Sequence, residues 1–223
     1  EDTGYIKNKF ILKIINKFVM FVYNRSDAII AQSDSFKSHI TNNYKIKKKI
    51  FTLYQPSDFK FQKYIKKKNK IHYITFAGNF GNAQNLDILI KAFKSKKLKK
   101  NIKLNLIGSG KQFNSLKEKI KIFKLKKKIN LLSYKNKSEL KKLLSYSSGL
   151  VITLKNGKSL NKTIPGKFQT YISFGKPLLI SSNSILNSIV YRNNIGYVSK
   201  PNDLNKLILN INKISMLNEK KKK

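Results

Sequence analysis

Three short segments of this sequence combine residue types that could bind a phosphorylated ligand. Residues 78–82 read GNFGN and residues 108–111 read GSGK, and each follows a short apolar run. Glycine lets the backbone approach a ligand closely, and free amides at the start of a helix favour phosphate. Each loop alone is a weak signal, because a glycine turn after a strand is usually only a turn. Neither has the spacing of a P-loop or of a complete dinucleotide fingerprint, so a dinucleotide dehydrogenase is poorly supported.

The third segment, residues 163–177, reads TIPGKFQTYISFGKP. It places the hydroxyl of Thr163, a rigid Pro165-Gly166 turn and the ammonium of Lys167 at the start of a predicted helix. Proline fixes the backbone there, and a helix start beside a cation suits a diphosphate. The alternative is that the turn only caps an ordinary helix and that Lys167 is one lysine among many. The sequence leaves both interpretations open.

Acidic side chains are absent from a long stretch around this third segment. Residues 140–202 contain neither Asp nor Glu. They therefore cannot supply the carboxylate pair of a glycosidase or an acidic metal site. The two histidines, His39 and His72, are isolated in the sequence. His72 lies among apolar residues of a predicted strand, and we expect its role to be structural.

Composition excludes several other classes of site. The 223 residues include no cysteine, which rules out disulfides, thiolate zinc sites and a cysteine nucleophile within this sequence. Lys and Arg total 48 against 10 Asp and Glu, a formal charge of +38, but only Arg25 and Arg192 are arginines. Lys, Ile and Asn share A/T-rich codons, so genome composition explains the charge. Nucleic acid is not an expected partner, because its recognition generally needs Arg forks. An anionic membrane surface fits better, since point-charge lysines suffice there.

Apolar periodicity predicts the elements that position these loops. Residues 10–23 form a basic amphipathic helix, which either lies on a bilayer surface or, as we favour, packs within a globular domain. A strand at 28–31, a helix from Ser33 or Asp34 to Tyr44 and a strand at 50–54 follow. Strands and helices then alternate, with strands at 71–76, 102–107, 129–132, 150–154 and 177–180 and helices at 84–94, 111–123, 138–146, 165–174 and 203–217. This alternation predicts a doubly wound parallel sheet of the α/β class, whose ligands bind at the carboxyl ends of the strands.

Taken together, the segments resemble a known family of enzymes. Residues 74–93, 104–113 and 163–177, in that order and spacing, look like the C-terminal, nucleotide-sugar-binding half of family 4 glycosyltransferases, which have the GT-B fold of two facing Rossmann-like domains. Residues 26–36 (SDAIIAQSDSF) resemble the last strand-helix unit of the N-terminal domain. The PGKFQTY version of the third motif is similar to a subgroup that builds bacterial surface polysaccharides, often transferring amino sugars to lipid-linked acceptors. The resemblance runs from about Tyr5 to Asn218.

The resemblance implies four parts. Residues 1–57 would be the end of an acceptor-side N-terminal domain, 58–70 a polar linker, 71–217 the Rossmann-like nucleotide-sugar-binding domain and 218–223 a solvated basic tail. The first residue is Glu1 rather than Met, and family members are nearly twice as long, so we expect a fragment. Such a fragment would bind the donor without transferring the sugar by itself.

The resemblance also implies a hexosyl or N-acetylhexosaminyl transfer that retains anomeric configuration and needs no metal. The nucleoside-diphosphate sugar would be a co-substrate and no other cofactor is implied; the catalytic residues stay unassigned. Helix-start amides and a cation would stabilise the leaving diphosphate. The residues implied at the donor diphosphate and sugar are Gly78, Asn79, Gly81, Thr163, Lys167, Gln169 and Thr170. Those implied in the nucleotide cleft are Gly108, Ser109, Ser133 and Tyr134.

Two departures from the family pattern shift these expectations. Better-known members carry two glutamates where this sequence has Lys162 and Thr170, which changes the donor-sugar contacts. Many relatives also have Arg and Lys in the first loop, where this chain has Asn79 and, near the helix start, Gln84 and Asn85. We therefore expect the diphosphate charge to fall on Lys167 or a neighbouring lysine.

The expected partners are a nucleotide-sugar and a saccharide or lipid-linked acceptor. The expected location is the cytoplasm, with peripheral contact at the inner face of an anionic membrane. The competing hypothesis is a non-catalytic basic module that binds anionic membrane or nucleic acid and uses its Rossmann-like domain as a scaffold. The distribution of lysines on the surface separates the two, since a binding module needs a continuous basic stripe.

Overall fold

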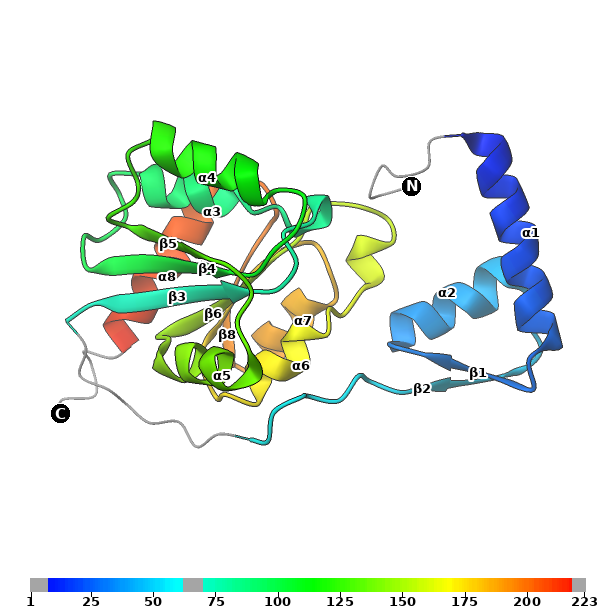
Figure 1. Cartoon of the computed structure of the whole chain (residues 1–223). Coiled ribbons are helices and arrows are strands. Elements are labelled where there is room, and N and C mark those ends of the chain that lie inside the picture. Colours follow the sequence, from blue (N-terminus) through cyan, green and yellow to red (C-terminus); the bar gives the residue numbers. More distant parts are fainter. Residues whose placement is uncertain (1–7, 62–69, 218–223) are drawn as a thin grey trace.

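The computed structural model describes residues 8–61 and 70–217 and contains two parallel sheets (Figure 1). A two-stranded sheet belongs to a small N-terminal unit, and a six-stranded sheet organises the larger unit that follows. The predicted tail at 218–223 and most of the predicted linker at 58–70 lie outside the described residues.

The N-terminal unit comprises α1 (Lys9–Arg25), β1 (Ala28–Ala31), α2 (Asp34–Tyr44) and β2 (Lys49–Thr52). The strands β1 and β2 pair in parallel, and α2 begins where the Ser33 hydroxyl accepts a hydrogen bond from the Phe36 amide. The core of this unit is small, and the described residues contribute four buried apolar side chains to it: Ile29, Ala31, Ile40 and Ile46.

Helix α1 is mostly uncovered. It meets α2 through an edge-to-face contact of Tyr23 with Tyr44, but none of its residues is buried. Phe10 and Phe18 are 70% and 66% exposed. The predicted amphipathic helix is confirmed, but the favoured packing of its apolar side within a globular domain is not observed among the described residues. No helix in the described ranges has both the length and the apolar character to cross a membrane.

The larger sheet contains β3 (His72–Ala77), β4 (Ile102–Ile107), β5 (Ile129–Leu132), β6 (Gly149–Thr153), β7 (Leu178–Ser181) and β8 (Gly196–Ser199). All five pairings are parallel, in the order β5-β4-β3-β6-β7-β8. The chain therefore builds outward from β3 in one direction and then outward from β6 in the other. Such a reversal creates a crevice at the carboxyl ends of the central strands. The predicted doubly wound parallel sheet is confirmed.

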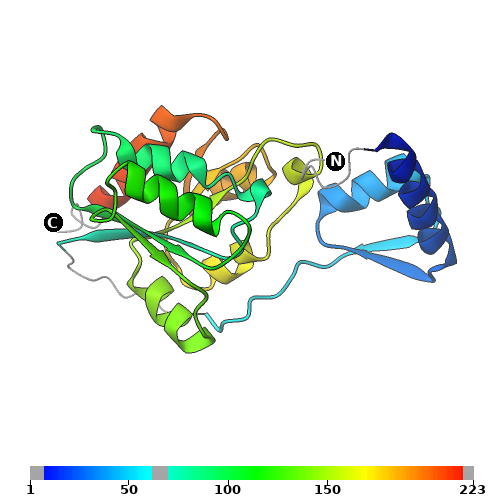
Figure 2. The ribbon, with the colours of Figure 1, turned by 45° about the horizontal axis from the view of Figure 1, so that its top comes forward.

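Helices cover both faces of this sheet (Figures 1 and 2). One core lies under α3 (Asp87–Lys94), α4 (Phe113–Ile122) and α8 (Leu204–Leu217), and the other under α5 (Lys137–Tyr146), α6 (Lys167–Ile172) and α7 (Leu186–Arg192). Two short 3-10 helices, η1 (Asn82–Gln84) and η2 (Leu160–Lys162), lie in the connections. Alternate residues of a strand serve opposite cores, since Leu106 packs in the first and Ile107 in the second.

Helix α7 and strand β8 were not predicted from the sequence, nor was the short 3-10 helix η2. The residues of α7 and β8 lie in 182–199, where Ser, Asn and Gly interrupt the apolar residues, so neither element shows a clear period. The strand β8 begins at Gly196, where an added Cβ would lie 2.0 Å from the Leu178 carbonyl oxygen. Only the position of β7 makes that glycine necessary. The helix predicted from residue 84 begins instead at Asp87, because Asn85 adopts a left-handed conformation with φ of 46°.

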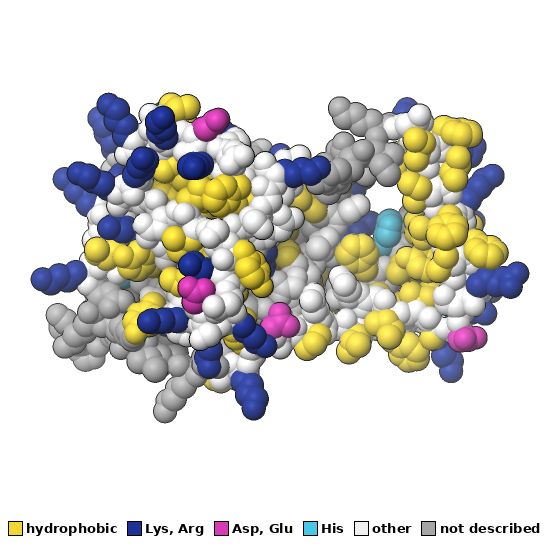
Figure 3. Space-filling model, viewed as in Figure 1, with side chains coloured by type: hydrophobic (Ala, Val, Ile, Leu, Met, Phe, Trp, Pro, Cys, Tyr) yellow, Lys and Arg dark blue, Asp and Glu magenta, His cyan; other side chains and the backbone are white. Residues whose placement is uncertain are grey.

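The lysines of the larger unit are dispersed. On the face that Figure 3 shows, Lys and Arg side chains stand apart among uncharged and apolar side chains. A continuous basic stripe is not visible on that face of the described residues. This dispersal is what a compositional origin of the charge predicts.

Candidate functional site

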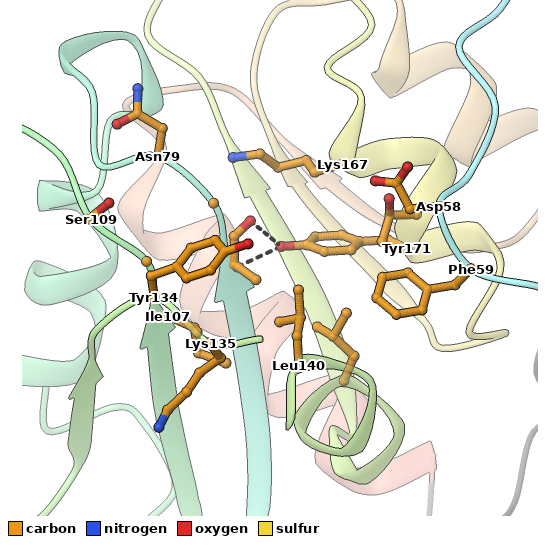
Figure 4. A pocket seen from close by; sticks show the side chains of 15 residues that line it. Asp58, Phe59, Asn79, Ile107, Ser109, Tyr134, Lys135, Leu140, Lys167 and Tyr171 are labelled. Carbon is orange, nitrogen blue, oxygen red and sulfur yellow. Dashed lines mark hydrogen bonds between the residues drawn. The ribbon is translucent and has the colours of Figure 1, made fainter. Parts of the chain in front are cut away.

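A pocket of about 440 Å³ opens at the carboxyl ends of β3 and β4, between their loops and helices α5 and α6 (Figure 4). Its lining residues are Asp58, Phe59, Ala77, Gly78, Asn79, Ile107, Gly108, Ser109, Tyr134, Lys135, Leu140, Leu144, Lys167, Thr170 and Tyr171. This is the edge of the sheet at which open α/β folds bind ligands.

The two glycine loops form one wall of the pocket by direct backbone contact. Gly78 and Gly108 have φ values of 141° and 145°, which side chains rarely tolerate. A Cβ on Gly108 would lie 2.0 Å from the Gly78 carbonyl oxygen. The Phe80 amide also donates to the Ser109 carbonyl at 2.7 Å. Glycine at 108 is thus required because the loop after β4 presses against the loop after β3.

Two backbone amides in this wall are free to bind a ligand. Asn79 and Ser109 follow the two glycines and line the pocket. Their N–H groups have no acceptor within the described part of the chain. By contrast, the amides of Gly78 and Gly108 donate to the carbonyls of Ile107 and Leu132. Free amides on adjacent loops form a concavity suited to an anion.

Lys167 lies at the start of α6 and extends beneath the first glycine loop. Its Nζ donates to the Gln84 side-chain oxygen at 2.5 Å and stands 3.9 Å from the centre of the Phe76 ring. It also lies 3.3 Å from the point where a Cβ on Gly78 would be. Burial lowers the pKa of Lys167 to about 7. Among the described residues, no carboxylate forms an ion pair with it.

Tyr171 fixes the position of α6 against the sheet. Its buried hydroxyl accepts from the Ala77 amide at 2.7 Å and donates to the Ala77 carbonyl at 3.2 Å. Burial raises the pKa of Tyr171 well above its ordinary value. Since Lys167 and Tyr171 are four residues apart on one helix, they share a face. The Tyr171 contacts therefore hold Lys167 toward the carboxyl end of β3. Sequence analysis gave no role to Tyr171.

The opposite wall is mainly apolar. It includes Leu140 and Leu144 of α5 and the ring of Phe59. In Figure 4 the Tyr134 side chain points across the pocket toward Tyr171, and Lys135 points away from it. Tyr134 is 78% exposed, so its ring is available to a ligand at the mouth.

The structure brings together seven of the eleven predicted site residues: Gly78, Asn79, Gly108, Ser109, Tyr134, Lys167 and Thr170. Gly81, Ser133, Thr163 and Gln169 are not among the lining residues. Gly81 precedes η1. The Thr163 hydroxyl donates a hydrogen bond to the Ser159 carbonyl oxygen at 2.9 Å.

Asp58 and Phe59 are lining residues that the sequence analysis assigned to a linker. They belong to a polar, Lys-dense run without periodicity, so no local pattern distinguishes them. Their place in the pocket depends on the path of the chain between the two units.

His39 is not isolated in the structure. The Lys162 ammonium lies 2.7 Å from His39 Nδ1, and the Ser33 hydroxyl donates to the Lys162 carbonyl at 3.3 Å. Desolvation, with a smaller contribution from Lys162, lowers the pKa of His39.

His72, expected to be structural, is buried in β3 with its Nδ1 3.3 Å from the Ser148 hydroxyl. Within the described ranges, no three His, Cys, Asp or Glu side chains form a group that could hold a metal.

Comparison with known families decides the assignment. The sequence model of the family described as "Glycosyl transferases group 1" matches residues 56–223, or 168 of the 223 residues. The chain belongs to this family. No curated protein matches the sequence at a significant level.

Solved structures show that this group 1 glycosyl transferase chain has the Rossmann-like architecture of GT-B enzymes. It is similar to a TarM mutant of S. aureus, crystallised with fondaparinux, alpha-GlcNAc-glycerol and UDP, with a TM-score of 0.73 and 17% identity over 96% of this chain. The pneumococcal O-GlcNAc transferase GtfA gives 0.69 and 14% over 90%, and WaaG, a glycosyltransferase of lipopolysaccharide biosynthesis, gives 0.66 and 14% over 83%. The chain spans 41%, 40% and 52% of those chains, respectively.

Proposed function

We propose that this chain binds a nucleoside-diphosphate sugar in the pocket at the ends of β3 and β4 and serves in transfer of that sugar. The transferred group is a hexose or N-acetylhexosamine, and the acceptor is a growing polysaccharide or a lipid-linked saccharide. Retention of anomeric configuration and independence of metal are parts of this proposal. Membership of the glycosyl transferase family supports the reaction class, and the pocket supports the donor.

The environment of Lys167 carries the proposal. Its ammonium is surrounded by a phenyl ring, an amide oxygen and the Gly78 backbone, without a carboxylate among the described residues. A cation in such a place is stabilised by an anionic ligand. Asn79 and Ser109, whose amides are free among the described residues, line the same pocket. A diphosphate fits this set, because one cation and two N–H groups can share its charge.

These groups also suit the chemistry of transfer. When the bond between the anomeric carbon and the donor oxygen breaks, negative charge grows on the leaving diphosphate. Fixed N–H donors and an ammonium aimed at that charge lower the barrier without reorganising during the reaction. Structures of TarM and GtfA with UDP are among the similar ones, and they support a uridine or related nucleotide here.

A peripheral position at the inner face of an anionic membrane is a further part of the proposal. Helix α1 supports it, because exposed Phe10, Ile14 and Phe18 accompany exposed lysines on the same helix. Amphipathic helices of this composition bind the interface between lipid headgroups and acyl chains. A lipid-linked acceptor would be reached most readily from such a position.

Calorimetric titration with UDP, GDP and their sugar derivatives tests the donor site. Lys167→Met, which keeps the length of the side chain, should weaken binding of the preferred nucleotide by about 1.5–3 kcal/mol, the range for charged hydrogen bonds. Lys141→Met is the matched control, because Lys141 is exposed on α5 and does not line the pocket. Equal losses in both variants, or no binding of any nucleotide to the folded wild type, would contradict the proposal. Circular dichroism verifies the fold.

A further inference from the structure

Among the residues that the structure describes, one carboxylate lines the pocket. Asp58 is the only Asp or Glu among its lining residues. Residues 140–202, which include α6, contain no acidic residue. The carboxylate is supplied instead by the segment that leads from the N-terminal unit to the larger one. In Figure 4, Asp58 lies beside Tyr171, on the opposite side of the pocket from Asn79 and Ser109.

Contacts of the next residue hold this segment in place. The Phe59 ring packs edge-on against Phe174, with centroids 5.2 Å apart, and the Lys137 ammonium lies 5.5 Å from its centre. The Ser57 hydroxyl accepts from the Phe59 amide at 3.1 Å and donates to the Phe59 carbonyl at 3.0 Å. Phe59 thus anchors the chain on the larger unit, and Asp58 is presented at the pocket wall.

Asp58 is an exposed residue, so its carboxylate is open to solvent or to a ligand. Within the described residues it forms no hydrogen bond and no ion pair, with Lys167 or any other group. An ionised carboxylate accepts hydrogen bonds and repels phosphate. It therefore suits a ligand group that carries hydroxyls and no negative charge. In a nucleoside-diphosphate sugar, the ribose and the transferred sugar are such groups.

We propose that Asp58 accepts hydrogen bonds from the ribose 2′- and 3′-hydroxyls of the donor nucleotide, an inference that rests on the proposed function. The diphosphate then lies at the glycine loops and Lys167, where the free amides and the ammonium are. The ribose lies on the Asp58 side, and in Figure 4 the ammonium ends of Lys167 and Lys135 point away from Asp58. Attraction at one end and repulsion of phosphate at the other give the nucleotide one direction in the pocket. Asp58 acts as a specificity residue, without a part in bond breaking.

The test compares nucleotides that differ in one hydroxyl. UDP and 2′-deoxy-UDP are titrated calorimetrically into the wild type, Asp58→Asn and the control Glu118→Gln, an exposed acid on α4 outside the pocket. GDP and 2′-deoxy-GDP replace them if the wild type prefers guanine. We expect the wild type to bind the ribonucleotide about five- to tenfold more tightly, the size of a partly exposed charged hydrogen bond. Asp58→Asn should lose that factor for the ribonucleotide alone, so the ratio approaches one.

The outcomes separate this inference from the proposed function. Equal weakening of both nucleotides by Asp58→Asn would assign it a general electrostatic or structural effect and overturn the ribose contact. A wild type that binds both nucleotides equally well would also overturn it, while the donor site would stand. Absence of binding to every ribonucleoside diphosphate would remove the proposed function itself. A retained preference in Glu118→Gln and a lost one in Asp58→Asn support the inference.

Discussion

The depressed pKa of Lys167 predicts that the proposed donor binding depends on pH in a defined direction. Burial lowers this pKa to about 7, so near neutral pH about half of the free molecules carry a neutral lysine. A diphosphate beside the amine favours the charged form and raises the pKa in the complex. The complex therefore holds more protons than the free protein, and its affinity falls as pH rises through 7.

The size of the effect follows from the free-state pKa. If Lys167 stays charged in the complex, the binding constant is proportional to the charged fraction of the free protein. With a pKa of about 7, that fraction changes about 30-fold between about pH 6 and about pH 8.5, equivalent to about 2 kcal/mol. A lysine with its ordinary pKa would be fully charged throughout this interval and would give no change.

The assay is calorimetric titration with a nucleotide-sugar rather than free UDP. The two phosphates of a nucleotide-sugar have no group that titrates near neutral pH, whereas a terminal phosphate has a pKa of about 6. Repeating the titration near pH 7 in buffers of different ionisation enthalpy should reveal uptake of about half a proton per site. Lys167→Arg is the matched variant, because arginine stays charged and should remove the pH dependence while retaining binding.

Two results would refute this reasoning. Affinity that is constant across the interval in the wild type would mean that Lys167 is charged in the free protein or lies away from the phosphate. A slope that persists in Lys167→Arg and Lys167→Met would assign the proton to another group.

Three further predictions concern the glycine loops, the positioning of α6 and helix α1. Gly108→Ala should lower the free energy of unfolding in urea by about 2–4 kcal/mol, because residue 108 has a φ of 145° and the added Cβ would overlap a backbone oxygen. Gly81→Ala should cost far less, since the Cβ added there would contact only a flexible side chain at 3.2 Å. An equal cost at both positions would contradict the close approach of the loops. Tyr171→Phe should lower the free energy of unfolding by about 1–3 kcal/mol, because it leaves the buried Ala77 amide and carbonyl without their partner. Unchanged stability would show that those two hydrogen bonds contribute little. The chain should float with anionic vesicles more than with neutral ones, by at most about 1 kcal/mol per lysine and less at high salt, and the preference should weaken when glutamine replaces the α1 lysines Lys9, Lys13 and Lys17. Equal flotation with both lipids would leave α1 as a packing surface.

Local patterns were sufficient to predict the main elements of the larger unit. Strands of four to six residues and helices with regular apolar spacing depend on neighbours a few positions away, and the alternation of both types predicts a parallel sheet. Elements of that kind were predicted, whereas α7 and β8 were missed because Ser, Asn and Gly interrupt the apolar residues of 182–199 and obscure the period. The glycine loops and the Pro-Gly-Lys turn were also recognisable, since each requires a particular backbone conformation at a strand end or helix start.

Only the tertiary structure decided how those local features combine. The order β5-β4-β3-β6-β7-β8 brings the loops after β3 and β4 into contact, and this explains why residue 108 is glycine. Packing of α6 on β3 turns Tyr171 into an anchor and buries Lys167 enough to depress its pKa. The path of the chain between the two units carries Asp58 to the pocket. Desolvation and such contacts depend on residues tens of positions apart, and no local spacing encodes them. The sequence by itself predicted a ligand-binding edge at the carboxyl ends of the strands, and the assembled sheet decided which side chains line the pocket there.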